Sequence, residues 1–388
     1  MHRAPIVAAF IITLSMPALA QQSGPTTTSP AISGPITIDR GGVYTGHYRS
    51  TDSATPAITI TTNEPVEITG CRIESAGTHI KAFGGTRLHI HHNTFTGLTP
   101  TGDHQWGRVL DDYHPRTLVF EHNTVDHTGG LLIDHSDEHT ISAIIRNNRF
   151  RNTDKRRADG TAGDHRAAIL FNTVLPIEAE IAWNEFENVP GESHVEDNIN
   201  LFNTGGTRER PILVHDNFVR GAYPFPLDAD AFTGSGITVD GDPSHHTFAD
   251  VSQHIRIYEN QVISTCNAGI NVAAGHDVDV QHNTIVSAGV YPDGTKSKLF
   301  WAGGAVWDGS KVGPLVFKDI TYKNNTIGYV REGMSKPFPD RQDVSEGVDL
   351  RDNISLPNPI TLETERAERE RWERKVAERG QVIGNARR

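Results

Sequence analysis

The sequence predicts an all-β protein that winds as a single-domain parallel β-helix of about ten coils, and two observations carry this prediction. First, short segments that alternate apolar and polar residues end in asparagine nine times, at Asn93, Asn123, Asn148, Asn184, Asn217, Asn260, Asn283, Asn325 and Asn353. Second, the interval between successive asparagines varies from 23 residues (Asn260 to Asn283) to 43 residues (Asn217 to Asn260). One part of each repeat is therefore constant while another accepts insertions, as in a solenoid.

Each repeat reads as a strand, a one-residue corner at the asparagine and a second short strand, as in LHIHHNTF around Asn93. We expect the asparagine to adopt the left-handed conformation at this corner, because asparagine tolerates it. Its side-chain amide would then hydrogen-bond to the amide one coil above, about 4.8 Å away, and form an asparagine ladder. The segment VEITGCRIES predicts an earlier coil with Cys71 in the asparagine position.

With these repeats, residues 36 to 355 resemble the right-handed parallel β-helices of the pectate-lyase-like superfamily, whose coils carry asparagine ladders of this kind. The resemblance implies the architecture and its handedness. It does not imply one chemistry, because this fold serves polysaccharide lyases, glycoside hydrolases, epimerases and phage tailspikes. Leucine-rich repeats would need recurrent leucines, and propeller blades would need four strands per period.

The N-terminal segments predict export. Residues 1–20 read as a signal peptide, with Arg3, the apolar run IVAAFIITL and a small-residue exit ending at Ala20. The apolar run is too short to span a membrane. Residues 21–35 are rich in Thr, Ser and Pro and predict a disordered leader, after which the β-helix occupies residues 36–360. We therefore expect a secreted or periplasmic protein.

Residues 361–388 predict a charged C-terminal helix and tail. Trp372 and Val376 lie one helical turn apart, and Gly380 provides a stop. Because a solenoid must cover its open ends, we expect this helix to cap the stack or to run as a strap along its side. A partner-binding helix is the alternative.

The two cysteines predict buried thiols. Cys71 occupies the first ladder position and Cys266 follows the seventh asparagine. Six coils would separate them by about 29 Å, whereas the Cα atoms of a disulfide lie within about 7 Å.

The formal charge of −12 argues against nucleic acid as a partner. It also weighs mildly against a polyanionic substrate, unless basic residues or a calcium ion reverse the field in a groove. Calcium is the one cofactor that the acidic residues leave open, although no loop has a calcium-binding signature. The 20 histidines are scattered without HExxH or comparable spacing, so we expect solvated side chains at coil corners and no structural zinc site.

The segments that precede the ladder strands predict a groove. They align as RVLDDYH, GLLIDHS, RAAILFN, DNINLFN, SGITVDG, AGINVAA and GGAVWDG. An inward column through Leu131, Ala168 and Ile199 would point a second set of residues outward, namely Asp112, Asp134, Phe171, Phe202 and Asp240. Outward phenylalanines would stack on sugar rings, or the loop over residues 151–164 would cover them.

A charged cluster adjoins this column. His165 and Arg166 precede one strand, Glu196 and Asp197 precede the next, and we expect Arg166 to face Asp197. His165 can transfer protons near neutral pH, and Arg166 can neutralise a substrate carboxylate or pair with Asp197. We predict catalytic roles for His165, Arg166, Glu196, Asp197 and Asp240, and substrate binding by Asp112, Asp134, Phe171, Asn198, Asn200, Phe202, Asp242 and His276. A salt-bridged loop network is the alternative.

Three functions fit this prediction. A lyase that cleaves a uronate-containing polysaccharide by β-elimination needs a group that neutralises the carboxylate and a base, which Arg166, His165 and Lys155 can supply. A glycoside hydrolase needs paired carboxyl groups, such as Asp112 with Asp134 or Glu196 with Asp240. A noncatalytic glycan-binding protein needs only aromatic and amide groups. The absence of Lys and Arg from the outward columns argues against the lyase, whereas the resemblance favours it.

Overall fold

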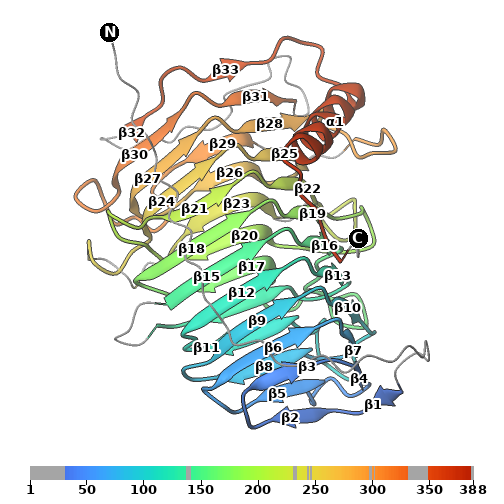
Figure 1. The fold of residues 1–388 in the computed structure, drawn as a ribbon. Coiled ribbons are helices and arrows are strands. Elements are labelled where there is room, and N and C mark those ends of the chain that lie inside the picture. The colour runs from blue at the N-terminus through green and yellow to red at the C-terminus, as the bar shows by residue number, and fades with distance from the viewer. Residues whose placement is uncertain are drawn as a thin grey trace. The chain divides into compact units, whose positions relative to one another are not determined.

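The computed structural model describes residues 31–136, 141–229, 234–242, 244, 247–296, 299–300, 302–330 and 348–385. Over these residues the chain forms the short strands β1 to β33 and the helix α1, and residues 32–385 belong to one compact unit. The strands join three parallel sheets, and from β1 to β31 the chain visits sheets A, B and C in strict rotation (Figure 1). The molecule is therefore a parallel β-helix, as predicted, and such parallel crossovers are right-handed.

Each coil from β1 to β30 contributes one strand to each sheet, and the last described strands, β31, β32 and β33, belong to sheets A, C and A. Sheet A contains β1 (Ile32–Ser33), β4 (His47–Ser50), β7 (Arg72–Ser75), β10 (Thr94–Gly97), β13 (Thr124–Asp126), β16 (Arg149–Arg151), β19 (Glu185–Glu187), β22 (Phe218–Ala222), β25 (Gln261–Thr265), β28 (Thr284–Ser287), β31 (Thr326–Tyr329) and β33 (Ile354–Ser355). Sheet B contains β2 (Ile36–Ile38), β5 (Ile58–Ile60), β8 (Ile80–Phe83), β11 (Leu110–Tyr113), β14 (Leu131–Asp134), β17 (Ala167–Asn172), β20 (Asp197–Phe202), β23 (Ser235–Asp240), β26 (Ala268–Val272) and β29 (Ala302–Val306). Sheet C contains β3 (Gly42–Tyr44), β6 (Pro65–Thr69), β9 (Arg87–His91), β12 (Thr117–Glu121), β15 (Ile141–Arg146), β18 (Ile177–Ala182), β21 (Ile212–His215), β24 (Gln253–Tyr258), β27 (His276–Gln281), β30 (Lys318–Lys323) and β32 (Val348–Asp349).

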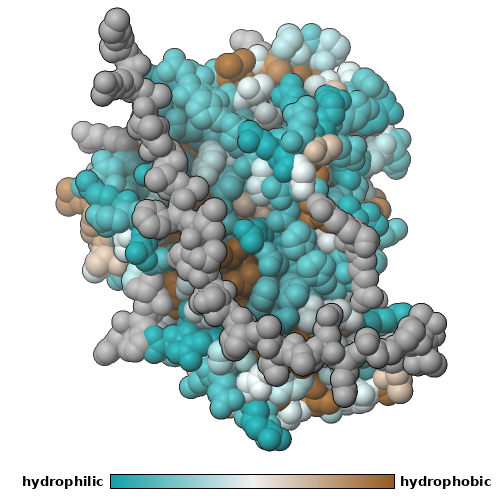
Figure 2. Space-filling view, viewed as in Figure 1, coloured by the Kyte–Doolittle hydropathy of each residue, from teal (hydrophilic) through white to brown (hydrophobic). Residues whose placement is uncertain are grey.

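The core consists of inward columns of apolar side chains, because every second residue of a strand points into the coil. In sheet B, Leu131 pairs with Ile169 and Ile169 pairs with Ile199, and all three side chains are buried. Burying an aliphatic side chain of this size contributes about 1.5–3 kcal/mol. Hydrophilic residues cover most of the described surface on the face seen in Figure 2.

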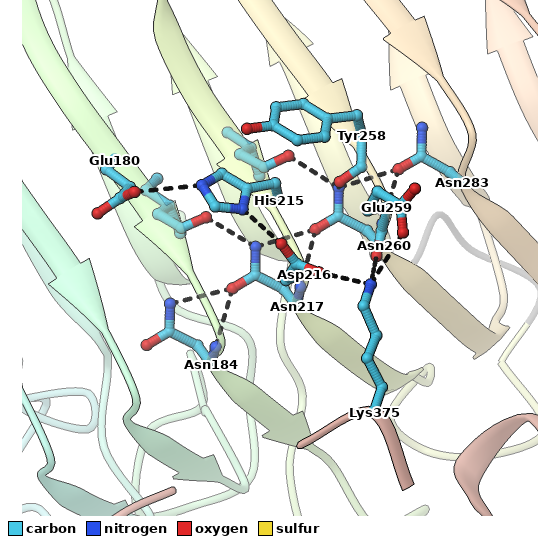
Figure 3. A network of polar contacts seen from close by, with 12 residues as sticks. Glu180, Asn184, His215, Asp216, Asn217, Tyr258, Glu259, Asn260, Asn283 and Lys375 are labelled. Carbon is cyan, nitrogen blue, oxygen red and sulfur yellow. Dashed lines mark hydrogen bonds and ion pairs between the residues drawn. The ribbon is translucent and has the colours of Figure 1, made fainter. Parts of the chain in front are cut away.

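The asparagine ladder runs along the corner between sheets C and A. The Nδ2 atom of Asn217 donates to the Oδ1 atom of Asn260 at 2.9 Å and to the carbonyl of Ile181 at 2.8 Å (Figure 3). Its Oδ1 atom accepts from Nδ2 and from the backbone N–H of Asn184, both at 3.0 Å. The same pattern joins the ladder from Asn93 to Asn353. The backbone N–H of Cys71 donates to Asn93 at 2.8 Å, which confirms its predicted position.

The ladder asparagines are not the left-handed residues of these corners, so that expectation is wrong. The residue before each asparagine takes this conformation instead, with φ of 55° at His92, 55° at Asp216 and 58° at Glu259. The asparagine side chain must point into the coil to reach the next amide. The bend is therefore made by the preceding residue, whose own side chain points outward.

The helix α1 (Leu362–Glu378) is a strap along sheet A rather than a lid over an end, and it packs against β25 and β28 (Figure 1). Trp372 is buried against Phe218, with ring centroids 5.3 Å apart, and Val376 joins the same cluster. Lys375 forms ion pairs with Asp216 at 2.5 Å and Glu259 at 3.1 Å, so the strap is attached to the corner residues (Figure 3). The helix ends before Gly380, as predicted, where φ is 63°.

Other predictions concern the cysteines and the N-terminal segments. Cys71 and Cys266 are buried thiols that are not joined in a disulfide, as predicted. The predicted signal peptide and most of the predicted leader lie outside the described residues, and β1 begins at Ile32. Within the part of the chain that the structure describes, no helix has the length and apolarity needed to cross a membrane.

Candidate functional site

A cleft of about 430 Å³ lies on the outer face of sheet B, over β17, β20 and β23. Its lining combines strand residues with residues that directly precede strands: Arg108, Asp164, His165, Arg166, Ala167, Leu170, Asn172, Glu196, Asp197, Asn200, Phe202 and Asp240. Both cationic and acidic side chains therefore converge on one concave surface, as they do at many binding sites.

One outward column of sheet B crosses the cleft and continues beyond it. Strand pairing places Asp134, Asn172, Phe202 and Asp240 in this column, one residue per coil. In the other direction the column continues from Asp134 to Tyr113 and Phe83, which are 37% and 53% exposed. Exposed aromatic residues therefore extend the polar cleft toward the N-terminal coils.

His165, Glu196 and Lys155 form a hydrogen-bonded group at one wall of the cleft. The Nδ1 atom of His165 donates to Oε1 of Glu196, and Lys155 Nζ donates to Oε2 of Glu196 at 3.1 Å. The His165 side chain is 83% exposed, whereas those of Glu196 and Lys155 are 13% and 12% exposed. The hydrogen bond to Glu196 raises the pKa of His165. Burial acts to raise the pKa of Glu196, but the bonds from His165 and the charge of Lys155 outweigh it and lower this pKa.

Two aspartates lie deeper, and both have raised pKa values. Burial, and then the charges of Glu196 and Asp240, raise the pKa of Asp197 to about 6. Its carboxylate accepts hydrogen bonds from the backbone of Ser235, from Thr238 and from Asn200, at 2.8 to 3.0 Å. Burial also raises the pKa of Asp240. A carboxyl group with a raised pKa can act as a general acid.

Arg108 and Arg166 bring two guanidinium groups to the same cleft. Burial, and then the nearby charge of Arg108, lower the pKa of Arg166 to about 9. The Nε atom of Arg166 and the Nη1 atom of Arg108 are buried without a hydrogen-bond partner among the described residues. Gly129 makes room for this pair, because a Cβ atom there would lie 2.8 Å from Cδ of Arg166. Buried donors without partners are uncommon and favour an anionic ligand.

All five residues predicted to be catalytic come together at the cleft. Seven predicted residues line it: His165, Arg166, Glu196, Asp197, Asn200, Phe202 and Asp240. The expected pairing of Arg166 with Asp197 is wrong by one residue, because Ala167 pairs with Asp197. The guanidinium instead lies near Arg108 and Asp164, and its Nη1 donates to the carbonyl of His165 at 3.0 Å.

Three predicted binding residues point into the coil. Phe171 pairs with Ile133 and Leu201 in the core and is buried. Asp112 pairs with Ile133, and burial raises its pKa to about 7 while Thr86 donates to both oxygens. Asn198 is buried and donates to the carbonyl of Gly221 at 3.0 Å. The expectation that they face the groove is wrong, and the proposed Asp112–Asp134 carboxylate pair is excluded because the two residues lie on opposite faces of sheet B.

The remaining predicted binding residues lie beside the cleft or away from it. Asp134 adjoins the cleft and accepts a hydrogen bond from Asn172 at 2.8 Å. Asp242 follows β23 outside the lining, where it accepts from the backbone of Ser244 at 2.7 Å. His276 belongs to β27 of sheet C and is buried, with its ring stacked 3.5 Å from that of Phe248. Its predicted place in the groove is wrong, because the turn at Gly275 carries the chain into the next sheet.

Sequence reasoning missed Arg108, Leu170, Asn172 and Gly129. Arg108 and Arg166 reach the cleft from positions shortly before β11 and β17, outside the predicted outward columns, which contain no Arg or Lys. The signal was a basic residue shortly before each of two sheet B strands, in RVLDD and in RAAIL.

Two acidic residues of the cleft, Glu196 and Asp197, are already engaged by donors of the protein. Calcium takes six to eight oxygen ligands. The two oxygens of Glu196 already bond to His165 and Lys155, and those of Asp197 accept from three donors. Arg108 and Arg166 bring positive charge to the same cleft.

Comparisons with known proteins add a fold-level likeness. No family model matches the sequence, and no curated protein matches it. Among solved structures, the chain is similar to the PL6 family polysaccharide lyase Pedsa3628 from Pseudopedobacter saltans, with 11% sequence identity and a TM-score of 0.42. The alignment covers 86% of this chain and 91% of that one.

Proposed function

We propose that this protein is an exported polysaccharide lyase that cleaves a uronate-containing glycan by β-elimination in the cleft over β17, β20 and β23. The observation that carries the proposal is the pair Arg108 and Arg166, which line the cleft together with His165 and Glu196 and each have a buried nitrogen atom without a hydrogen-bond partner among the described residues. Arginine binds carboxylates through paired N–H donors. The guanidinium groups neutralise the charge of a uronate carboxylate bound there. The proton on the adjacent C5 then becomes more acidic.

The elimination then requires a base and an acid. We assign the base to the exposed ring of His165, whose Nδ1 is held by Glu196 and whose Nε2 accepts the C5 proton. The C4–O4 bond breaks, a C4=C5 double bond forms, and the departing O4 takes a proton from Asp240, whose raised pKa favours the protonated form. Lys155 keeps Glu196 ionised and in place.

A glycoside hydrolase is the second candidate, and the shifted pKa values favour it. The pKa of Asp240 is raised and that of Glu196 is lowered, within one cleft. Two carboxyl groups whose pKa values are pushed apart are the pattern of a general acid and its partner base or nucleophile. In this reaction Arg108 and Arg166 would contribute only to binding.

One assay separates the candidates. The purified protein is incubated with a panel of uronate-containing and neutral polysaccharides, and both ultraviolet absorbance and reducing ends are followed. A lyase produces the conjugated unsaturated uronate and its absorbance, whereas a hydrolase produces reducing ends alone. The absence of both, with binding retained, would leave a noncatalytic glycan-binding protein.

The variant Arg166→Met tests whether the arginine pair binds the substrate carboxylate. We expect kcat/KM on the uronate substrate to fall at least about 100-fold, while the thermal unfolding temperature stays the same or rises, because a costly buried donor is removed. The matched control is Arg149→Met on sheet A, where Arg149 bonds to the buried Glu185 at 2.7 Å. That variant should lose stability and keep its activity. If the protein is a lyase and its Arg166→Met variant is fully active, Arg166 does not bind the substrate carboxylate and the proposed carboxylate site is wrong.

A further inference from the structure

A cluster of histidine and glutamate side chains lies on the outer face of sheet C, separate from the cleft on sheet B. Glu67 lies on β6, and His89 and His91 lie two residues apart on β9, so both rings project from the same face of the strand. Strand pairing places Glu67 directly beside His89 and Thr69 beside His91. One ligand atom from each of Glu67, His89 and His91 lies within 4.8 Å of the other two.

This separation is close to that of ligands on one metal ion. Histidine nitrogen and carboxylate oxygen bind zinc at about 2.0–2.2 Å, so two ligand atoms on one ion are at most about 4 Å apart. The three side chains are half-buried. Nε2 of His91 already lies 3.1 Å from Oε1 of Glu67, and the two imidazole rings are stacked with centroids 4.1 Å apart.

The neighbours hold these rings as outer-shell residues do in zinc sites. Glu121 on β12 accepts a hydrogen bond from His89 at 3.1 Å and one from Arg146 at 2.8 Å. The Nδ1 atom of His91 lies 2.8 Å from Nδ1 of His92 and 3.3 Å from the hydroxyl of Thr69. One nitrogen of each ring is therefore engaged and the orientation of the ring is fixed.

We propose that Glu67, His89 and His91 form a binding site for a divalent transition-metal ion such as Zn²⁺. The set of two imidazoles and one carboxylate suits zinc, and a water molecule would complete the tetrahedral coordination. Because the ligands come from two successive coils, the ion ties those coils together and stabilises the folded chain. The site is independent of the proposed lyase reaction, since it lies on another sheet. It also revises the expectation that the histidines are solvated corner residues.

The site is tested by isothermal titration of the full chain, without an affinity tag and after treatment with a chelator, using ZnCl₂. We expect one ion per chain, with the affinity reduced at least about 10-fold by His91→Ala and by Glu67→Gln. Glu67→Gln keeps the shape of the side chain, so equal thermal unfolding of this variant and the wild type without metal separates a ligand role from a folding defect. Zinc should raise the unfolding temperature of the wild type but not of the variants.

A matched control comes from an exposed histidine outside this cluster that also bonds to a glutamate. His165→Ala removes the ring that bonds to Glu196 in the cleft, and it should leave the affinity for zinc unchanged. The proposal is overturned if the wild type binds no zinc, if His91→Ala and Glu67→Gln bind it as tightly as the wild type, or if His165→Ala alone abolishes binding.

Discussion

The ladder corner and the cleft are both lined by polar side chains at the ends of short strands. At the corner these groups bond to one another, whereas in the cleft some of them have no partner among the described residues. At the corner, the amide of Asn217 bonds to Asn184 on one side and Asn260 on the other. In the cleft, nitrogen atoms of Arg108 and Arg166 are buried without partners among the described residues. Polar groups that satisfy one another coil after coil stabilise the fold, whereas unsatisfied groups that converge on a cavity are available to a ligand.

The largest expected effect comes from breaking the ladder with Asn217→Leu. This change removes the two hydrogen bonds that Nδ2 donates, and it leaves the backbone N–H and the side-chain amide of Asn184 without their acceptor. Each buried unsatisfied group costs about 1–3 kcal/mol, so we expect a loss on the order of 4 kcal/mol in the free energy of unfolding. Denaturant titration measures this loss.

The cleft offers the control for that experiment. Asn200→Leu replaces an asparagine whose Nδ2 bonds to Asp197 and whose Oδ1 has no partner among the described residues. Its stability should change by less than about 1 kcal/mol, because Asp197 keeps its bonds from Ser235 and Thr238. Equal destabilisation by the two variants would contradict the distinction between the two regions.

The next effect is a pH dependence at the same corner. His215 lies between Glu180 and Asp216, and Asp216 bonds in turn to Lys375 of the strap (Figure 3). Burial acts to lower the pKa of His215, but the bonds to Asp216 and Glu180 raise it to about 9. An unfolded histidine titrates near 6.5, so the stabilisation is complete below about pH 6.5 and is lost as the pH rises through about 9.

We expect this loss to reach about 3 kcal/mol between pH 6 and pH 9.5. Thermal unfolding of the wild type and of His215→Gln across this range measures it. The wild type should lose stability with rising pH, and the curve of the variant should be flatter. Parallel curves would mean that the ionised carboxylates do not hold an imidazolium there.

A third effect is a loss of activity at unchanged stability. His165→Ala and Glu196→Gln should each lower kcat at least about 100-fold, as expected for the loss of a proton-transferring group and of the residue that positions it. In addition, Glu196→Gln should move the pKa of the rising limb of the pH–rate profile downward, because the bond from His165 to Glu196 raises that pKa. Stopped assays over a pH series, with thermal unfolding of both variants, check this. An equal loss of folding would assign both residues to a structural network.

The ladder and the cleft also differ in how well the sequence predicted them. The ladder was predictable because the asparagine recurs beside apolar residues in every coil, and each corner reinforces the others. The strand register of the cleft was not, because Ala168, Ile169 and Leu170 are all apolar and alternation alone does not fix the phase. A shift of one residue exchanges the two faces of a strand, so Phe171 was placed outward although it is buried.

Contacts between coils explain the other omissions. Arg108 and Arg166 belong to different coils and precede their strands, where alternation assigns no direction to a side chain. Glu67 and His91 likewise come from separate coils, so no local motif links them. The fold follows from a repeated local pattern, whereas both candidate sites depend on which residues the stacking places side by side.

The smallest effect concerns the aromatic part of the outward column. Phe202 lines the cleft beside Asp240, and Tyr113 lies three coils away in the same column, at about 14 Å. If a glycan runs along this column, Phe202→Ala should raise KM about 10-fold on long chains and change kcat little, because stacking on the ring contributes to binding in both the ground state and the transition state. Tyr113→Ala should raise KM only for oligosaccharides long enough to reach it. Equal effects of Tyr113→Ala on short and long substrates would place the glycan along another path, and the column would then be part of the protein surface rather than an extension of the cleft.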